Sequence, residues 1–347
     1  MFFRRQKPID PKTEPFRGVN LGGWLLLERW ITPSLFKDLA AGDEYSLCEL
    51  DSEDLNRKII NHHNTFITES DFEWLAKQGI TAVRLPVGYW VFGDEPPFSG
   101  NIEYVDKAFA WAKQTHIKIL LDLHGAPGSQ NGWQESGRIG DIGWPEDERN
   151  IIASLRIIEK LSRRYADHPS LLGIELLNEP HPKIKTAILK KYYKASYKII
   201  RKNCGPDVWV VFSDSFKPRR WAWHLWASKF PNLYIDTHQY QAYTARDRRM
   251  DVAGHIKKTL HKVDKQITKM ARYHPVIVGE WSLVLNGKST KGLNPVQLEA
   301  ARRAYGSAQL MTFEKASAWF FWTYKTEEGG VWSFKDCVER GRLPKFK

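Results

Sequence analysis

The sequence predicts a single-domain (β/α)8 barrel, the TIM-barrel fold, on three observations. Eight apolar runs of strand length recur along the 347 residues, and from the second onward they alternate with stretches of helical periodicity. The runs are mostly apolar rather than alternating, which is typical of parallel strands covered by helices. Barrels of this kind commonly reach this length as one domain. A doubly wound open sheet is the alternative.

The first predicted strand, Phe16–Leu21, follows an irregular lead-in over residues 1–15, so the barrel is expected over residues 16–347. Gly22 and Gly23 end this strand. No internal repeat, low-complexity tract or linker divides the chain. The other strands are expected at Thr81–Leu85, Ile117–Leu123, Leu171–Leu177, Val208–Phe212, Leu233–Thr237, Pro275–Trp281 and Ala316–Trp322.

Helices are expected between these strands. Thr68 and Asp71 form a capping pattern ahead of an apolar stretch, and Gly79 ends that helix. Residues 37–67 carry mixed charge without a strand period, and we expect a long connection of the functional type. A Trp-rich connection separates the fifth and sixth strands. The remaining helices are expected near 101–116, 146–166, 184–203, 251–272 and 295–313.

Composition limits the possible partners. The net charge of +12, from 52 Lys and Arg against 40 Asp and Glu, lies largely in helical stretches such as Lys183–Arg201 and Lys257–Arg272. Charged faces of outer helices explain it, and without a recognition motif we expect no nucleic-acid partner. The three cysteines, Cys48, Cys204 and Cys337, form neither a zinc pattern nor a disulfide framework.

No apolar run reaches transmembrane length, so no membrane insertion is expected. The basic N-terminus lacks the apolar stretch of a secretory leader. We expect a cytoplasmic protein, or a secreted one whose leader is absent from this sequence.

Polar side chains stand where the predicted strands stop, and in such barrels the strands' C-terminal ends form the active site. In Asn178-Glu179-Pro180, the proline biases Glu179 towards extended backbone at the strand end. Any one of these residues could be structural, but a whole set converging by chance is not expected. The strand ends carry Asn20, Arg84, His124, Asn178, Glu179, Ser213, Asp214, His238, Tyr240, Glu280, Trp322 and Tyr324.

Two of these residues, Glu179 and Glu280, each end an apolar strand, an arrangement that suits cleavage of a glycoside. Retaining cleavage needs two carboxyl groups about 5–5.5 Å apart, one as acid/base and one as nucleophile. The acid should have a raised pKa, while the nucleophile must be ionised, with Arg84 as its stabiliser. Asn178 is a candidate to bind the sugar 2-hydroxyl.

Other conspicuous residues have simpler interpretations. Mid-strand Glu175 is expected to point into the barrel or to pair with a buried base, and Asp214 to be a strand-end hydrogen-bond partner. His62 and His63 are expected to be a surface pair. Asp141 and Trp144 are candidates for distal subsites, weighed evenly against a structural role. Core packing is expected for Trp221, Trp223 and Trp226, one of which could be a sugar platform.

Several longer segments are more specific than any strand end. They are Arg17–Trp24, Ile31–Phe36, Asp43–Tyr45, Val83–Trp90 and Asp122–Gly132. With these segments the sequence resembles glycoside hydrolase family 5, and within it the fungal-type exo-β-1,3-glucanases, from Phe16 to about Phe334. The Asn178-Glu179-Pro180 and Gly279-Glu280-Trp281 elements are shared more broadly across that family.

The resemblance implies a retaining enzyme that releases glucose from the non-reducing end of β-1,3-glucan by double displacement. Glu179 would be the acid/base and Glu280 the nucleophile. Glu28 would hold the terminal glucose, and Trp133 with Tyr243 would clamp the next sugar. No cofactor or metal is implied, and a monomer is expected. The cleaved bond would be surrounded by Arg84, His124, Asn178, His238, Tyr240 and Trp322.

The chain departs from the fungal pattern near the terminal-sugar pocket. Arg29 and Trp30 stand where that pattern has Pro-Tyr, and Gln134 where it has an acidic residue. These changes leave two alternatives of the same mechanism open, an endo-acting β-glucanase and a β-glucosidase that acts on glycolipids. A non-catalytic sugar-binding barrel is disfavoured because both glutamates are present.

Overall fold

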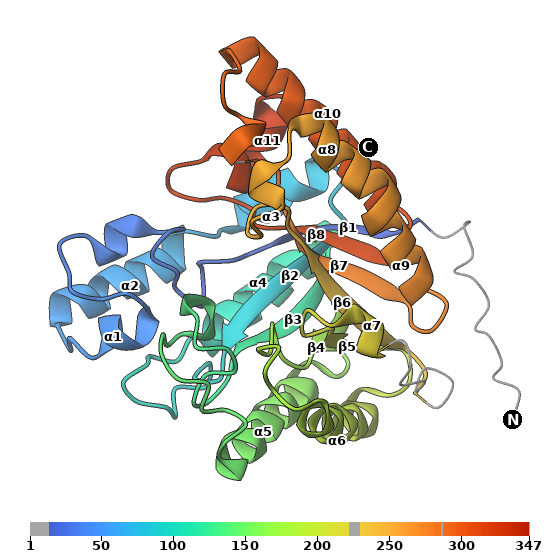
Figure 1. Cartoon of the computed structure of the whole chain (residues 1–347). Helices are drawn as coiled ribbons and strands as arrows, with labels where there is room; N and C mark the ends of the chain where they lie inside the picture. The colour runs from blue at the N-terminus through green and yellow to red at the C-terminus, as the bar shows by residue number, and fades with distance from the viewer. Residues whose placement is uncertain (1–13, 222–229, 286, 347) are drawn as a thin grey trace, which may run out of the picture.

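Eight parallel strands close into a barrel at the centre of the molecule (Figure 1). The computed structural model describes residues 14–346 except 222–229 and 286. Strand β1 closes the ring by pairing with β8, with Phe16 beside Ala318, which confirms the barrel and excludes the open sheet. The strands are β1 Phe16–Asn20, β2 Ala82–Gly88, β3 Lys118–Gly125, β4 Leu171–Glu175, β5 Trp209–Ser213, β6 Leu233–Gln239, β7 Val276–Trp281 and β8 Ala318–Phe321.

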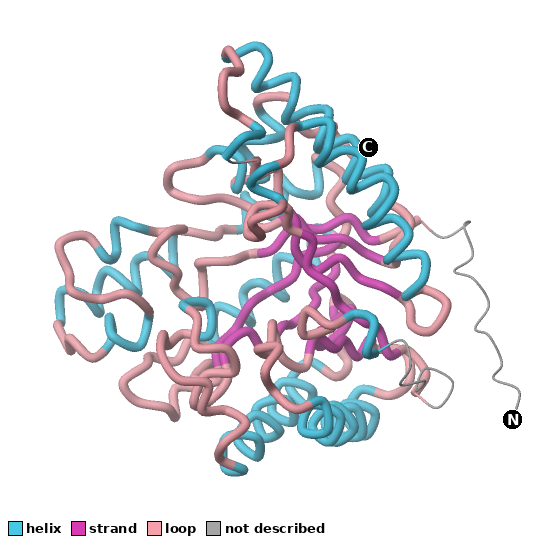
Figure 2. Tube along the Cα trace, viewed as in Figure 1, coloured by secondary structure: helices cyan, strands magenta, loops and turns pink. Residues whose placement is uncertain are grey.

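Helices surround the barrel, and each connection between consecutive strands contains at least one (Figure 2). The helix predicted near 251–272 is a composite, in which a π-helical turn, Lys258–Val263, joins α8 to α9. The helices are α1 Glu44–Cys48, α2 Glu53–Thr65, α3 Glu69–Lys77, α4 Ile102–Thr115, α5 Glu148–Tyr165, α6 Thr186–Cys204, α7 Pro218–Trp221, α8 Val252–Lys257, α9 Asp264–Met270, α10 Pro295–Phe313 and α11 Phe334–Glu339.

Side chains in the sequence set where helices begin. The predicted cap of α3 forms, with the Thr68 amide donating to the Asp71 carboxylate at 2.9 Å. Asn294 caps α10 through its own side chain, which accepts from the Gln297 amide at 2.9 Å. Because such caps satisfy amides that the helix leaves unpaired, each stabilises the fold by about 1 kcal/mol.

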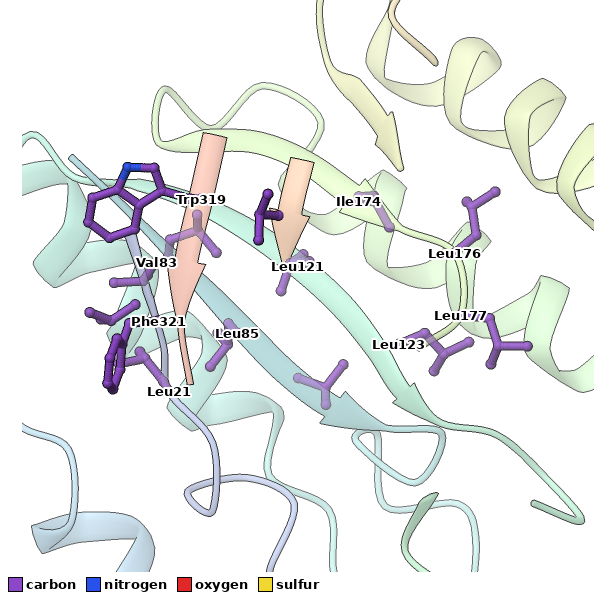
Figure 3. Close-up of a cluster of buried hydrophobic side chains, with 14 of the residues drawn as sticks. Leu21, Val83, Leu85, Leu121, Leu123, Ile174, Leu176, Leu177, Trp319 and Phe321 are labelled. Atoms are coloured by element: carbon purple, nitrogen blue, oxygen red, sulfur yellow. The ribbon is translucent and has the colours of Figure 1, made fainter. Parts of the chain in front are cut away.

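Apolar layers lie on both sides of the strands. The outer layer packs between strands and helices and includes Val83, Leu85, Leu121 and Leu123 (Figure 3). An inner layer fills the N-terminal end of the barrel with Ala82, Leu120, Leu172, Val211, Tyr234, Ile277, Ala318 and Phe320. Phe320 fits there because Gly18 has no side chain; a Cβ on Gly18 would lie 2.3 Å from the ring.

Two residues further along the strands, the barrel interior becomes charged. Arg84 follows Ala82 and Asp236 follows Tyr234 on the same face, because side chains of a strand alternate. Arg84, Asp122, Glu175 and Asp236 are all fully buried. Unpaired buried charges cost several kcal/mol, so this layer must pair internally. It forms the floor of the candidate site.

Two expectations outside the site are wrong, and the structure favours the structural alternative for Trp144. The connection over residues 37–67 contains α1 and α2, which pack over a second apolar cluster. His62 and His63 are buried rather than on the surface, and His62 Nε2 lies 2.7 Å from the Gly23 carbonyl oxygen. Trp144 is fully buried and its indole donates to Ser154 at 3.0 Å, so it cannot line a subsite.

Other expectations are confirmed. Glu175 points into the barrel and pairs with Arg84, and Asp214 accepts from the Phe216 amide at 2.7 Å. Trp221 is buried in the core, whereas Trp223, Trp226 and residues 1–13 lie outside the described residues. In the described part of the chain, no helix combines the length and the apolar character that a membrane span requires.

Candidate active site

The two glutamates singled out by the sequence meet at the C-terminal mouth of the barrel. Glu280 lies within β7, while Glu179 lies in the loop four residues beyond the end of β4. Glu179 is not extended as Pro180 predicts, since its φ is +39°, a left-handed conformation that costs about 1–3 kcal/mol. The Asn131 amide holds this backbone by donating to the Glu179 carbonyl at 3.2 Å.

His238 of β6 lies between the two carboxyl groups. Its Nδ1 is 2.6 Å from Glu179 Oε1 and 3.4 Å from Glu280 Oε2, and its Nε2 is 3.1 Å from Asp236. One oxygen of each glutamate and one nitrogen of His238 all lie within 4.8 Å of one another. Burial lowers the pKa of His238, but the carboxylates of Glu280, Asp236 and Glu179 outweigh it and hold the pKa well above its ordinary value.

Glu280 accepts hydrogen bonds from two further groups. Tyr240 OH donates to its Oε2 at 2.8 Å and Arg84 Nη1 donates to its Oε1 at 3.2 Å. Burial raises the pKa of Glu280 to about 7, while His238, Arg84 and Tyr240 lower it and Glu179 raises it. The raised pKa therefore falls on the expected nucleophile, a group for which the sequence predicts an ionised state, and the three donors favour that ionised form.

Arg84 is the hub of the charged layer. Its guanidinium donates to Glu175 at 2.7 Å, to Asn20 at 2.9 Å and to the Asn178 side-chain oxygen at 2.8 Å, and it pairs with Asp122 at 3.0 Å. These carboxylates raise its pKa well above the ordinary value against the opposing effect of burial. Arg84 therefore fixes the amide of Asn178 with its nitrogen turned away from the guanidinium.

His124 accepts a hydrogen bond from the side-chain amide of Asn178. The Asn178 nitrogen lies 3.3 Å from His124 Nε2, and His124 Nδ1 lies 2.5 Å from Asp122. Burial lowers the pKa of His124, so the ring is neutral, donates from Nδ1 and accepts at Nε2. Trp322 stacks on the ring with centroids 5.3 Å apart, which adds a flat apolar wall.

A third glutamate, Glu28, stands beside the pair. It is buried and accepts a hydrogen bond from the indole of Trp30 at 2.8 Å. Burial, together with the charges of Glu280 and Glu179, raises its pKa to about 8 against the opposing effect of the Trp30 hydrogen bond. Trp30 in turn packs edge-on against Trp332. On this side of the mouth, Trp30 therefore contacts both the Glu28 carboxyl group and the Trp332 ring.

The predicted clamp residues, Trp133 and Tyr243, lie on exposed loops at the mouth. Trp133 is 38% exposed and packs edge-on against Phe216, whereas Tyr243 is 63% exposed and packs edge-on against Tyr240. No contact between Trp133 and Tyr243 is present among the described residues. They present two separate aromatic faces. That a sugar ring binds between these faces stays a prediction.

Comparison with known proteins identifies the family. A family model described as cellulase (glycosyl hydrolase family 5) matches residues 48–328. The chain belongs to glycosyl hydrolase family 5.

Among its relatives in family 5, a protein of Emericella nidulans described as probable glucan 1,3-beta-glucosidase A is 37% identical, over 95% of this chain and 90% of the relative. The glucan 1,3-beta-glucosidase of Blumeria graminis is 34% identical, over 98% of this chain and 89% of its own. A solved structure, the rutinosidase from Aspergillus niger, superposes with a TM-score of 0.80 at 25% identity, over 97% of this chain and 99% of that one.

One acidic residue of this family 5 site was missed from the sequence. Glu135 accepts from the Asn131 amide at 3.2 Å, the same amide that holds the Glu179 backbone. Its neighbour Gln134 turns away and donates to the Gly42 carbonyl at 2.5 Å. Burial and the charge of Glu179 raise the pKa of Glu135 well above its ordinary value. In the sequence, the acidic residue of the fungal pattern was compared with Gln134 only. Allowing a shift of one residue would have pointed to Glu135.

Proposed function

We propose that this protein is a retaining β-1,3-glucanase that removes glucose from the non-reducing end. The observation that carries the proposal is the closeness of the Glu179 and Glu280 carboxyl oxygens, within 4.8 Å. Retaining enzymes keep such groups about 5–5.5 Å apart, whereas inverting ones leave about 6.5–9.5 Å for a water molecule. The names of the fungal relatives support the β-1,3 linkage.

In the first step, a Glu280 oxygen attacks the anomeric carbon while Glu179 donates its proton to the glycosidic oxygen. The bond between the anomeric carbon and that oxygen breaks, the leaving sugar departs as an alcohol, and a glycosyl ester forms on Glu280. In the second step, Glu179 takes a proton from water as the water oxygen attacks the same carbon. The ester bond to Glu280 breaks, and the configuration is retained.

The surroundings of the pair suit these roles. Two ionised carboxylates at 4.8 Å would repel by roughly 3–4 kcal/mol at an effective dielectric constant of 20. A proton on Glu179 and the positive charge of His238 remove that repulsion. Arg84 and Tyr240 both donate to Glu280, which leaves it charged for attack. Glu179 accepts from His238 alone among these residues, which leaves its second oxygen for the substrate.

The proposed sugar pocket is built around this pair. The Asn178 amide would bind the 2-hydroxyl, Glu28 the far side of the terminal glucose, and Trp322 its flat face, with Trp133 and Tyr243 on the leaving-group side. The contacts of Trp30 with Glu28 and with Trp332 support exo action, because they place aromatic side chains at the terminal-sugar end of the proposed pocket. Two carboxyl groups and water suffice for this chemistry, so we propose neither metal nor cofactor, and a monomer as the active form.

The test is a time course of products from laminarin and β-1,3-gluco-oligosaccharides, separated by chromatography. Glucose alone at early times is the expected result, with retained β-configuration by NMR. A ladder of oligosaccharides would overturn exo action in favour of the endo alternative. Activity confined to glycolipids would overturn the proposal that β-1,3-glucan is the substrate. The Glu280→Gln variant, which keeps the shape of the side chain, is the control and should be inactive while still folding.

A further inference from the structure

Behind the proposed catalytic pair, two carboxyl groups lie side by side in the barrel interior. Glu175 of β4 and Asp236 of β6 are both fully buried. One oxygen of each lies within 4.8 Å of the other and of a His238 nitrogen. Two ionised carboxyl groups this close would repel by roughly 3–4 kcal/mol at an effective dielectric constant of 20, which favours a proton on one of them. A hydrogen bond between two carboxyl groups requires a proton on one of them.

The other contacts decide which group carries this proton. Both oxygens of Asp236 are already acceptors, Oδ1 from the Gly279 amide at 2.6 Å and Oδ2 from His238 Nε2 at 3.1 Å. Glu175 accepts only at Oε2, from Arg84 at 2.7 Å. Its Oε1 is buried and has no hydrogen-bonding donor among the described residues. Glu175 Oε1 is therefore the atom with room for the proton.

The charges around Glu175 favour the same assignment. The titratable and charged groups that face it are Arg84 from β2, Asp122 from β3, Asp236 and His238 from β6, Glu280 from β7 and Tyr193 from α6. Within the described ranges, Arg84 is the cation that forms an ion pair with Glu175, and it is shared with Asp122 at 3.0 Å and Glu280 at 3.2 Å. Burial raises the pKa of Glu175 well above its ordinary value, with Arg84 opposing and Asp236 adding to the rise.

We propose that Glu175 keeps a proton in the active enzyme and uses it to donate a hydrogen bond to Asp236, so that Asp236 remains the anion that fixes His238. The charged Asp236 accepts from His238 Nε2, and this contact aims Nδ1 at the gap between Glu179 and Glu280. Glu175 is thus a positioning residue that acts through Asp236 and His238. The effect of Glu175 on turnover rests on the proposed roles of Glu179 and Glu280. The protonation of Glu175 does not depend on those roles.

Substituting Glu175 by glutamine and by methionine distinguishes a hydrogen-bonding role of this side chain from a role of its bulk alone. A glutamine reproduces the protonated acid, because its carbonyl can accept from Arg84 while its NH2 donates to Asp236. A methionine has similar bulk but neither donates nor accepts in this way. Glu314 supplies the matched control, since its carboxylate is partly exposed and pairs with Arg17 at 2.9 Å.

The first measurement is infrared spectroscopy at pH 7, which distinguishes the carbonyl band of a protonated carboxylic acid from carboxylate and amide bands. The wild-type spectrum minus that of Glu175→Gln should contain the carboxylic-acid band. The corresponding difference for Glu314→Gln should contain only carboxylate bands. Absence of the acid band from the Glu175→Gln difference would overturn the proposal. This measurement needs no substrate, so failure of the proposed function would leave it unaffected.

The second measurement is urea unfolding as a function of pH. A carboxyl group whose folded pKa is raised makes folding take up a proton at every pH between its unfolded and folded pKa, so stability falls as pH rises through that window. Wild type should therefore take up about one more proton on folding than Glu175→Gln near pH 6–7. Parallel stability curves for the two proteins would contradict a protonated Glu175.

The third measurement is the pH profile of kcat on an aryl β-glucoside. Glu175→Met should lower kcat at least about tenfold, the effect of one lost hydrogen bond near 1.4 kcal/mol, and should displace the profile because His238 loses its fixed partner. Glu175→Gln should restore most of the rate and the position of the profile. A glutamine variant as impaired as the methionine variant would overturn the proposal, and the glutamine measurements decide it if the methionine variant does not fold.

Discussion

Replacing Tyr240 by phenylalanine tests how the nucleophile is held in its ionised state. The change removes a single hydroxyl, which donates to Glu280 Oε2 at 2.8 Å. The ring can stay in place, because it packs against Tyr243 and Trp332 through its faces and edges. The perturbation is therefore confined to one hydrogen bond on the proposed nucleophile.

The expected size follows from the pKa of Glu280. Burial raises that pKa to about 7, and the tyrosine hydroxyl is one of the groups that lower it. A hydrogen bond to a charged group contributes about 1.5–3 kcal/mol, and 1.36 kcal/mol corresponds to one pKa unit. Because the bond stabilises the ionised form, its loss should raise the pKa by about one to two units. Attack requires the ionised form, so activity should be lost at low pH first.

The assay is kcat/KM on a fluorogenic β-glucoside across pH 5–9, since this ratio reports the free enzyme. The acidic limb of Tyr240→Phe should move about one to two units to higher pH, with a loss of roughly 10- to 100-fold below the limb. Tyr243→Phe is the matched control, because its exposed ring lies next to Tyr240 and its hydroxyl makes no hydrogen bond within the described residues. An unmoved limb, or one moved to lower pH, would refute the reasoning.

Three further changes test other parts of the site. Glu179→Ala should lower kcat on glucan by about 10²–10⁴, but far less on substrates with activated aryl leaving groups; equal losses would argue against an acid role. Trp30→Phe removes the donor to Glu28 at 2.8 Å and should raise KM for β-1,3-gluco-oligosaccharides about tenfold with little change in kcat; an unchanged KM would separate Glu28 from sugar binding. Gly279→Ala would place a Cβ 2.0 Å from Asp236 and should lower the free energy of unfolding by about 1–3 kcal/mol, measured in urea; a stability equal to wild type would contradict this packing.

The fold could be predicted from the sequence because its pattern is set locally. Each strand is an apolar run, and helix starts carry their own caps, such as Thr68 with Asp71. The strand-end rule then brought Arg84, Glu179 and Glu280 to one mouth without any knowledge of distances. The contacts of Glu179 and Glu280 with His238, and of Arg84 with Glu280, agree with that prediction of proximity.

The remaining features depend on tertiary contacts that sequence periodicity does not encode. His62 is buried because the first loop packs its Gly23 carbonyl against α2, a long-range contact. Glu179 takes a left-handed backbone, against the local preference set by Pro180, because the side chain of Asn131 holds its carbonyl. Glu135 is held beside Glu179 by Asn131, whereas Gln134 donates to the Gly42 carbonyl of another loop. Each case is a local rule overridden by a specific distant partner.

The position of His238 explains how one buried layer can serve both steps of the proposed reaction. In the first step Glu280 loses its negative charge on forming the ester, while Glu179 gains one by giving up its proton. The total charge around His238 is therefore constant, and only its location changes. His238 Nδ1 lies 2.6 Å from Glu179 and 3.4 Å from Glu280, so the same cation stabilises whichever carboxylate is charged. A cation fixed on one carboxylate alone would favour one state and raise the barrier out of it. The anion behind His238, Asp236, has to stay charged throughout for this to work, which is the physical reason for placing the extra proton on Glu175.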